Sequence, residues 1–311
     1  MLGFHPGARH YRLMNSPNTS YGSVWIIGCG DIGRRVADLW QGQVADITGI
    51  VSCAPSAEIL NRLGIISAQT NLDDLEPPLP EMPASTLVYY FIPPPPSGID
   101  DRRCQHFLAS LSIQSVKPKR IVAISTTGVY GDCSGELISE DQPAKPKADR
   151  ARRRFDMENQ LKKWCERYNV PLILLRVGGI YGPKRLPLKR IEQAVPVLKE
   201  ELAPKTNRIH EDDLALICVA AASSLHQFRI YNVSDGTNSN MTEYFFTLAD
   251  HFGMARPPAL EWEQAEQEIS KGMLSYLRES RQVDNSRLLA ELDIKLRYPT
   301  LESALPSFTK K

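Results

Sequence analysis

The sequence predicts a doubly wound α/β fold, with a parallel sheet of about seven strands, helices on both faces and a small C-terminal lobe. Short apolar, β-branched runs alternate with helix-period segments from about residue 23 to residue 233. This alternation is typical of parallel strands joined by right-handed helical crossovers. A glycine-rich turn also separates the first apolar run from the first helical pattern. In sheets of this kind, ligands bind beyond the carboxyl ends of the strands.

The individual elements follow from the periodicity of the apolar residues. Apolar runs predict strands at 23–27, 47–51, 64–68, 86–92, 120–125, 171–176 and 228–233. Segments with apolar residues on one helical face predict helices at 32–41, 56–63, 102–112, 150–168 and 211–222. The alternation ends after Val233, where two further helices are predicted at 241–252 and 284–292.

The chain divides into a tail, a sheet domain and a lobe. Residues 1–22 are polar and irregular and lack the apolar core of a secretory signal, which predicts a flexible N-terminal tail. Met14 is a second candidate for the native start, because the first strand needs only residues from about 23 onward. The sheet domain is predicted to comprise 23–181 and 207–237, and the substrate-side lobe 182–206 and 238–311.

Composition narrows the class of protein. With 311 residues, 42% of them hydrophobic, and a formal net charge of +1, the chain has no overall field that favours nucleic acid or an anionic membrane. No apolar run approaches the roughly 20 residues that span a bilayer. The six cysteines are scattered, without a C-x-x-C pair, in apolar or Gly-rich segments. This pattern predicts buried free thiols and a reducing, cytoplasmic location.

The turn after the first strand reads Gly28-Cys29-Gly30-Asp31-Ile32-Gly33. Gly28 allows the tight turn, Gly30 lets a ligand approach the backbone, and Gly33 lets the helix pack closely on the strand. The free amides at the helix N-terminus can then bind phosphate. A strand before the turn and a helix after it make this pattern specific for NAD or NADP, and all six residues are predicted to contact the cofactor.

The end of the second strand bears on the choice between the two cofactors. NAD-specific sites usually carry Asp or Glu there, whereas this strand is followed by Ser52 and no carboxylate. Ser52 could donate to a 2′-phosphate, and Arg34 or Arg35 could reach the same group. The alternative is that both arginines are solvated surface charges. The sequence favours NADP over NAD.

Three further strand ends are predicted to line the cofactor. Prolines cannot donate backbone hydrogen bonds, so Ile92, Pro93 and the prolines that follow would form a stiff wall beside it. Ser125 and Thr126 place hydroxyls beside the expected nicotinamide, although Ser and Thr also cap turns often. Val177, after the next strand, completes the predicted cofactor-binding set.

The segments after the glycine turn resemble the extended short-chain dehydrogenase/reductase superfamily, which includes nucleotide-sugar epimerases and dehydratases. They match in order and spacing, and the resemblance covers nearly the whole chain from Ser23 on. It implies a Rossmann-type NAD(P)-binding domain. The matching segments are the glycine turn, 125–131 (STTGVYG), 175–183 (LRVGGIYGP), 207–214 (NRIHEDDL), 231–236 (YNVSDG) and 283–288 (VDNSRL).

The resemblance also reveals a departure. In the superfamily, a Tyr-x-x-x-Lys pair follows the Ser/Thr strand, and the lysine lowers the pKa of the tyrosine so that its phenol can exchange a proton with the substrate. Here Arg150 stands at the tyrosine position and Arg154 at the lysine position. Arginine can hold the nicotinamide ribose but is a poor proton donor. Thr126 matches the catalytic Ser/Thr. With the shorter G-x-G-x-x-G spacing, the chain is similar to atypical extended members.

Other polar residues have competing interpretations. Tyr130 is a candidate substitute acid, although this tyrosine is mostly structural or pocket-lining in the family. His210 and the three acids after it predict a helix cap and no metal site, because consecutive helical side chains diverge. The basic run 150–154 predicts a solvated helix face and no nucleic-acid partner. Arg278 and Arg281 could bind a diphosphate or lie on the surface.

Two functions remain open at this point. The first is an NAD(P)-linked oxidoreductase or epimerase/dehydratase that acts on a sugar-like or nucleotide-sugar substrate. Thr126 would then bind the reacting oxygen, Arg154 would orient the ribose, and water, Tyr130 or the substrate would move the proton. The second is a dinucleotide-binding sensor or scaffold without turnover. A homodimer is the expected assembly in either case.

Overall fold

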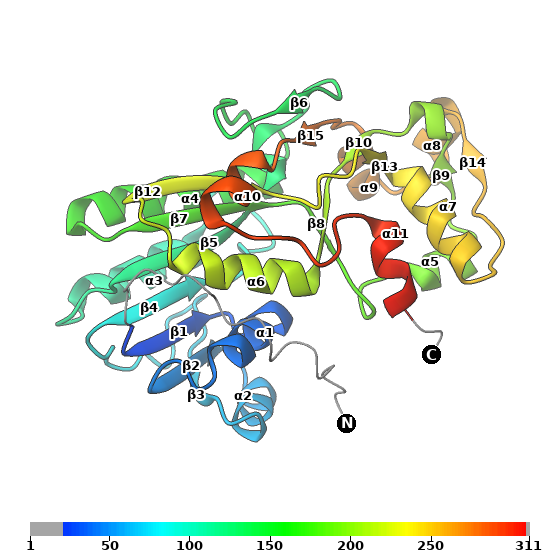
Figure 1. Cartoon of the computed structure of the whole chain (residues 1–311). Coiled ribbons are helices and arrows are strands. Elements are labelled where there is room, and N and C mark those ends of the chain that lie inside the picture. Colours follow the sequence, from blue (N-terminus) through cyan, green and yellow to red (C-terminus); the bar gives the residue numbers. More distant parts are fainter. Residues whose placement is uncertain (1–20, 309–311) are drawn as a thin grey trace.

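A computed structural model of the chain describes residues 21–308 (Figure 1). Most of the predicted tail 1–22, including Met14, lies outside the described residues, so the predicted tail and the alternative start stay predictions. In the described part, no helix is both long and apolar enough to cross a membrane.

Seven parallel strands form the central sheet, in the order β12-β7-β5-β4-β1-β2-β3. The chain runs outward from β1 to β3 and then returns to β4 on the other side of β1, which makes the β1/β4 boundary the switch point of the fold. The predicted sheet is confirmed. Its strands are β1 (Ser23–Ile27), β2 (Asp46–Val51), β3 (Ile66–Gln69), β4 (Thr86–Tyr90), β5 (Arg120–Thr126), β7 (Leu172–Val177) and β12 (Phe228–Val233).

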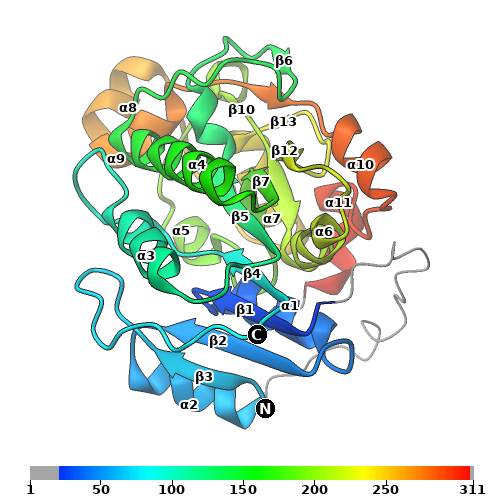
Figure 2. The ribbon, with the colours of Figure 1, turned by 90° about the vertical axis from the view of Figure 1, so that its left-hand side faces the viewer.

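Helices cover both faces, as predicted. Alternate residues of β1 divide between two cores: Val24 and Ile26 pack with α1 and α6, and Trp25 and Ile27 pack with α3 and α4. Figure 2 shows α3 and α4 on one side of the sheet and α6 on the other. The helices are α1 (Asp31–Trp40), α2 (Ala54–Arg62), α3 (Arg102–Ile113), α4 (Asp149–Tyr168) and α6 (Glu211–Ala222).

A lobe lies beyond the carboxyl ends of the strands (Figure 1). Its own apolar core includes Phe245, Leu248 and Phe252 of α7. The helices of this region are α5 (Leu188–Glu192), α7 (Met241–His251), α8 (Trp262–Glu268), α9 (Lys271–Leu277) and α11 (Leu301–Ala304). The short strands that complete the chain are β6 (Leu137–Ile138), β8 (Gly179–Tyr181), β9 (Val197–Leu198), β10 (Lys205–Thr206), β11 (Arg208–His210), β13 (Ser239–Asn240), β14 (Ala259–Leu260) and β15 (Gln282–Val283).

Two expectations need correction. Helix α10 (Ser286–Leu292), which falls within the predicted lobe segment 238–311, packs on the sheet domain instead. The reason is Leu288, which is fully buried in the core shared by α1 and α6. The described cysteines are all free, as expected, but two are not buried: Cys53, the N-cap residue of α2, is exposed, and Cys133 is half-buried.

Candidate functional site

The glycine turn has the steric features that the motif requires. Gly28 has φ +88°, and a Cβ there would lie 2.8 Å from Cγ1 of Ile92. A Cβ on Gly33 would lie 3.0 Å from Cγ2 of Ile26, so only glycine lets α1 sit this close to β1. A Cβ on Gly30 would have the carbonyl oxygen of Gly28 as its nearest neighbour, at 4.0 Å, which leaves room for a ligand.

The N-terminus of α1 is open toward this space. Gly30 is the N-cap residue, and no side chain caps the helix. Backbone amides of a first helical turn that lack a cap are suited to bind phosphate oxygens. The amides of Gly28 and Cys29 donate instead to the carbonyl of Ile50, at 3.0 and 3.2 Å, and so tie the turn to β2.

The two arginines predicted near a 2′-phosphate differ in their surroundings. Arg35 pairs with both Glu211 and Asp212. Arg34 has only a loose ion pair with Asp31, at 3.8 Å. Ser52 is exposed at the end of β2. Of the two arginines, Arg34 is therefore the one left available beside a cofactor.

The proline wall after β4 is held by arginines. Arg154 donates from Nη1 to the carbonyl of Ile92 at 2.8 Å, and Arg103 donates to the carbonyl of Pro93 at 3.1 Å. Arg153 donates to the carbonyl of Gly98. Prolines offer no N–H, but the loop keeps its carbonyl acceptors, and these guanidiniums satisfy those of Ile92, Pro93 and Gly98. Arg153 and Arg154 of the basic run 150–154 thus have structural partners here rather than a solvated face, and Arg150 has partners in the lobe.

Arg154 is linked to the glycine turn through one residue. Its partner Ile92 is the residue that contacts Gly28 of the turn. Burial lowers the pKa of Arg154, and the nearby Asp101 acts in the opposite direction. The side chain predicted to hold the nicotinamide ribose is therefore half-buried and fixes the segment that follows β4.

The two hydroxyls at the end of β5 have different roles. Ser125 donates to Glu158, which also binds Arg176 in a buried ion pair with 2.7 Å between Nη2 and Oε2. Its hydroxyl is therefore occupied within the protein. Thr126 accepts from the amide of Gly128 at 3.1 Å, so the turn-capping interpretation holds for it. A hydroxyl that accepts still has its own hydrogen to donate.

Tyr130 does not have the surroundings of a proton donor. It is fully buried, and its hydroxyl donates to Oδ1 of Asn232 at 2.7 Å. Burial raises the pKa of Tyr130, against the opposing effect of Arg176, which lies 4.7 Å from the ring centre. The geometry favours the structural interpretation of Tyr130 over the catalytic one.

The residue at the family's tyrosine position reaches the lobe. Arg150 donates from Nη1 to Oγ of Ser275 at 2.6 Å, and its guanidinium stacks 3.5 Å from the ring centre of Tyr276. Both partners belong to α9. Arg150 and Arg154, one helical turn apart, thus hold α9 and the end of β4 respectively.

Arg278 and Arg281, predicted either to bind an anion or to lie on the surface, differ in their surroundings. Arg278 forms a surface ion pair with Glu266 at 2.8 Å. Arg281 lies against the loop after Thr126, where it donates to the carbonyl of Gly131 at 2.7 Å. Its buried Nε has no hydrogen-bond partner among the described residues. Arg281 also pairs with Glu279, 3.0 Å from its Nη1, so its charge already has a partner and its contact with an anion stays a prediction.

His210 caps α6, as the sequence predicts. Its Nδ1 accepts from the amide of Asp212 at 3.1 Å, and its ring centre lies 4.0 Å from that of Tyr298. Burial lowers the pKa of His210 to about 4. Asp213 accepts from two backbone amides at 2.8 Å each. Within residues 21–308, no three metal-ligating side chains are grouped to hold an ion.

Sequence reasoning missed Arg185. Its Nη2 lies 3.0 Å from Oδ2 of Asp31 at the start of α1, and its Nε lies 3.2 Å from Oε2 of Glu211. The adjacent Gly182-Pro183 indicated a turn there. The partner residues could not be found from local pattern, because they are 154 and 26 positions away.

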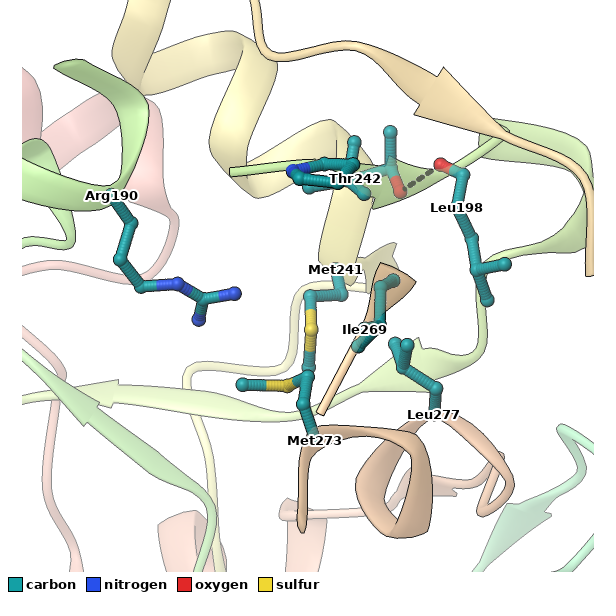
Figure 3. Close-up of a pocket in the computed structure, with 9 residues that line it drawn as sticks. Arg190, Leu198, Met241, Thr242, Ile269, Met273 and Leu277 are labelled. Atoms are coloured by element: carbon teal, nitrogen blue, oxygen red, sulfur yellow. Dashed lines mark hydrogen bonds between the residues drawn. The ribbon is translucent and has the colours of Figure 1, made fainter. Parts of the chain in front are cut away.

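A small cavity lies inside the lobe, away from the glycine turn (Figure 3). Arg190 extends toward the side chains of Met241 and Met273, and the hydroxyl of Thr242 donates to the carbonyl of Leu198 at 2.6 Å. Most of the lining is apolar. The guanidinium of Arg190 lies 5.0 Å from the ring centre of Phe245, so this charge is already shielded by an aromatic contact.

The fold and the site together define a Rossmann-type α/β protein with a dinucleotide-binding type of turn at the switch point of its sheet. Residues 106–234 match the NAD dependent epimerase/dehydratase family. The matched part contains the segments 125–131, 175–183 and 207–214, so this similarity agrees with the resemblance seen in the motifs. Over part of its length the chain is also similar to dTDP-D-glucose 4,6-dehydratase from Mus musculus (24% identity over 132 residues) and Homo sapiens (26% over 94 residues). The alignments cover 40% and 30% of this chain, and 37% and 27% of those enzymes.

Solved structures with the same fold cover most of the chain. A protein of unknown function from Silicibacter pomeroyi has a TM-score of 0.75 at 24% identity, over 92% of this chain and 97% of its own. UDP-glucose 4-epimerase from Thermotoga maritima, solved with UDP-glucose, has a TM-score of 0.71 at 16% identity (91% and 96%). UDP-glucuronic acid 4-epimerase from Bacillus cereus, solved with NAD, has a TM-score of 0.68 at 16% identity (92% and 97%).

Proposed function

We propose that this chain binds NAD or NADP at the Gly28–Gly33 turn and uses it for hydride transfer on a sugar-like or nucleotide-sugar substrate. The observation that carries the proposal is the open backbone above Gly30, at the uncapped N-terminus of α1 and beside the β1/β4 switch point. The solved relatives with NAD or UDP-glucose bound support the same choice of ligands.

The residues around the turn fit such a cofactor. The first-turn amides of α1 would hold the diphosphate, and Ile92 and Pro93 would form one side of the cleft. Val177 ends β7 two strands from β4 and would complete the far side. Arg154 would act from behind this surface by fixing the carbonyl of Ile92. The nicotinamide would supply a hydride acceptor or donor.

The chain's own residues define what the protein can contribute to the reaction. Thr126 would donate its hydroxyl hydrogen to the reacting oxygen of the substrate while it accepts from Gly128. Arg150 and Arg154 stay charged and do not release a proton. The proton would therefore pass to water or to another group of the substrate rather than to α4.

NADP is the cofactor that the second strand favours. Ser52 is exposed there, no carboxylate follows the strand, and Arg34 is held only by a 3.8 Å ion pair. A 2′-phosphate would gain a charge-assisted hydrogen bond from Arg34. A homodimer in the cytoplasm completes the proposal, and sedimentation velocity would test the assembly.

A second candidate is dinucleotide binding without turnover. Three hydrogen bonds favour it: Tyr130 donates to Asn232, Arg150 donates to Ser275 of α9, and Arg154 donates to the carbonyl of Ile92. These side chains hold the structure together where the family carries its proton-transfer pair. A sensor or scaffold needs only the binding half of the site.

The two candidates separate by two measurements. Quenching of intrinsic fluorescence by NADH and NADPH tests binding, and the absence of saturable binding by either nucleotide would reject both. A screen of UDP- and dTDP-sugars, followed through the absorbance of the reduced cofactor and by chromatography of the sugar, tests turnover. Turnover that Thr126→Val abolishes would establish the enzyme. Tight binding with every sugar unchanged would support the sensor.

A further inference from the structure

We propose that Arg185, on the loop between β8 and α5, binds the diphosphate of the dinucleotide together with the N-terminus of α1. This inference rests on the proposed function, because it concerns the same cofactor. It adds a cationic contact from outside the glycine motif. It also connects the loop that leads into the lobe to the occupancy of the cofactor turn.

The position of Arg185 is fixed by a tight turn. Its amide donates to the carbonyl of Gly182 at 2.8 Å, with Pro183 at the second position of the turn. A Cβ on Gly182 would lie 2.3 Å from Cδ of Glu211, so the turn is pressed against the start of α6. Glu211 in turn accepts from Nε of Arg185 at 3.2 Å. The guanidinium is therefore placed by backbone geometry and by a buried carboxylate.

This placement brings Arg185 to the residue that begins α1. Its Nη2 lies 3.0 Å from the carboxylate of Asp31, the residue directly after the N-cap Gly30. Among residues 21–308, Nη1 has no hydrogen-bond partner, and the side chain is 34% exposed. Arg185 thus has two unused N–H donors beside the amides proposed to hold the diphosphate.

The charges around α1 give Arg185 a second role. Three carboxylates gather here with three guanidiniums, and all are linked by ion pairs: Asp31, Glu211, Asp212, Arg34, Arg35 and Arg185. Burial alone would raise the pKa of Asp31, but the hydrogen bond from Arg185 and the charge of Arg35 lower it, so Asp31 stays ionised. An ionised carboxylate beside a diphosphate is repulsive unless a cation shields it. Removal of Arg185 would leave one uncompensated negative charge at the anion site.

Isothermal titration calorimetry of the full chain, which measures its affinity for NAD⁺, NADP⁺ and ADP, tests the proposal. Arg185→Ala is expected to weaken the binding of all three ligands by about tenfold, because one charge-assisted contact is lost and the charge of Asp31 is no longer shielded. Arg256→Ala is the matched control, because Arg256 is a lobe arginine with a comparable ion pair, 2.6 Å to Asp250, that is not part of the cluster around α1. It is expected to leave all three affinities unchanged.

A second substitution separates ligand contact from structural support. Asp31→Asn in the Arg185→Ala background is expected to recover part of the lost affinity, because the repulsive charge is gone. A purely structural role predicts that the double variant binds no better than the single one. If Arg185→Ala does not fold, as judged by circular dichroism, Arg185→Gln provides the same comparison with the side chain's length largely kept.

The outcomes are distinct. Wild-type affinity in Arg185→Ala, or no recovery in the double variant, would overturn this inference and leave dinucleotide binding intact. No binding of any of the three ligands by the wild-type protein would overturn the proposed function as well.

Discussion

The two halves of the sheet differ in how closely they match the pattern of the family that the chain resembles. Around β1 and α1, the positive φ of Gly28, the close packing of Gly33 and the open backbone at Gly30 preserve a dinucleotide turn. Around β5 and α4, Arg150 and Arg154, which we expect at the tyrosine and lysine positions, donate to Ser275 of α9 and to the carbonyl of Ile92. Under the proposed function, this difference means that cofactor binding and proton transfer depend on separate elements of the fold, so one can be retained while the other changes.

The largest effect is expected in the altered half, at the buried ion pair of Glu158 and Arg176. Glu158→Ala leaves a buried guanidinium without its carboxylate, which should lower the free energy of unfolding by about 3–5 kcal/mol. Glu166→Ala on the same helix removes an exposed pair, 3.9 Å from Lys162, and should cost less than about 0.5 kcal/mol. Urea unfolding measures both. Equal losses would show that α4 is not anchored through Glu158.

In the retained half, Gly28→Ala combines two penalties. The new Cβ meets Ile92 at 2.8 Å, and the backbone has φ +88°. Together these should cost about 2–4 kcal/mol in urea unfolding. Gly42→Ala is the control, because its φ is +76° but nothing lies within 4 Å of the added atom, so it should cost only about 1 kcal/mol. A similar loss in both variants would contradict the close contact of the turn with β4.

A pH effect is expected from His210, which borders the retained half. Burial lowers its pKa from 6.5 to about 4, so below pH 6.5 the unfolded chain binds a proton that the folded protein does not. Stability therefore falls as the pH drops from about 6.5 toward 4, by about 2 kcal/mol at pH 5. His210→Asn, which keeps an N-cap acceptor, should flatten this slope in thermal unfolding. Burial raises the pKa of Asp235 to about 6, which changes stability with pH in the opposite direction. This contribution is the same in the wild type and in His210→Asn, so it does not affect the comparison.

A smaller effect should distinguish Arg150 from Arg154, one helical turn apart on α4. Arg154→Met leaves the carbonyl of Ile92 without its donor and should weaken NADPH binding by about tenfold. Arg150→Met should leave this affinity within about twofold and instead speed proteolysis near α9, because it loses Ser275 and Tyr276. Fluorescence titration and limited trypsin digestion measure the two effects. The reverse result would show that Arg150, not Arg154, supports the cofactor edge.

The smallest expected effect concerns cofactor choice. Arg34→Ala should reduce the preference for NADPH over NADH by about threefold to tenfold, the range of one exposed charge-assisted contact. NADH affinity itself should change little. An unaltered ratio would mean that Arg34 is a solvated surface charge.

Most of the fold could be predicted because it is encoded locally. The strand and helix patterns between residues 23 and 233 match the observed elements to within a few positions, since each core-facing stripe repeats within its own segment. The glycine turn was equally visible, because its steric needs lie within six residues. The prediction places helix α10 in the lobe, which is wrong. An apolar residue such as Leu288 shows that a helix has a buried face, but it does not show which part of the protein that face packs against.

The candidate site was less predictable because its contacts join distant parts of the chain. Arg150 meets Ser275 across 125 positions, and Arg185 meets Asp31 across 154. The basic run 150–154 looked like a solvated face because its acceptors are backbone carbonyls of the proline loop, which leave no charge signal in the sequence.

The most direct test of cofactor binding at the glycine turn is calorimetric titration of the purified chain with NADP⁺ and NAD⁺, carried out on the wild type and on Gly30→Val. We predict saturable binding at one site per chain, tighter for NADP⁺, and its loss in Gly30→Val, whose side chain would fill the open space above the turn. Binding unaffected by Gly30→Val, or no binding of either nucleotide to the wild type, would contradict the claim that this half of the sheet is a working cofactor site.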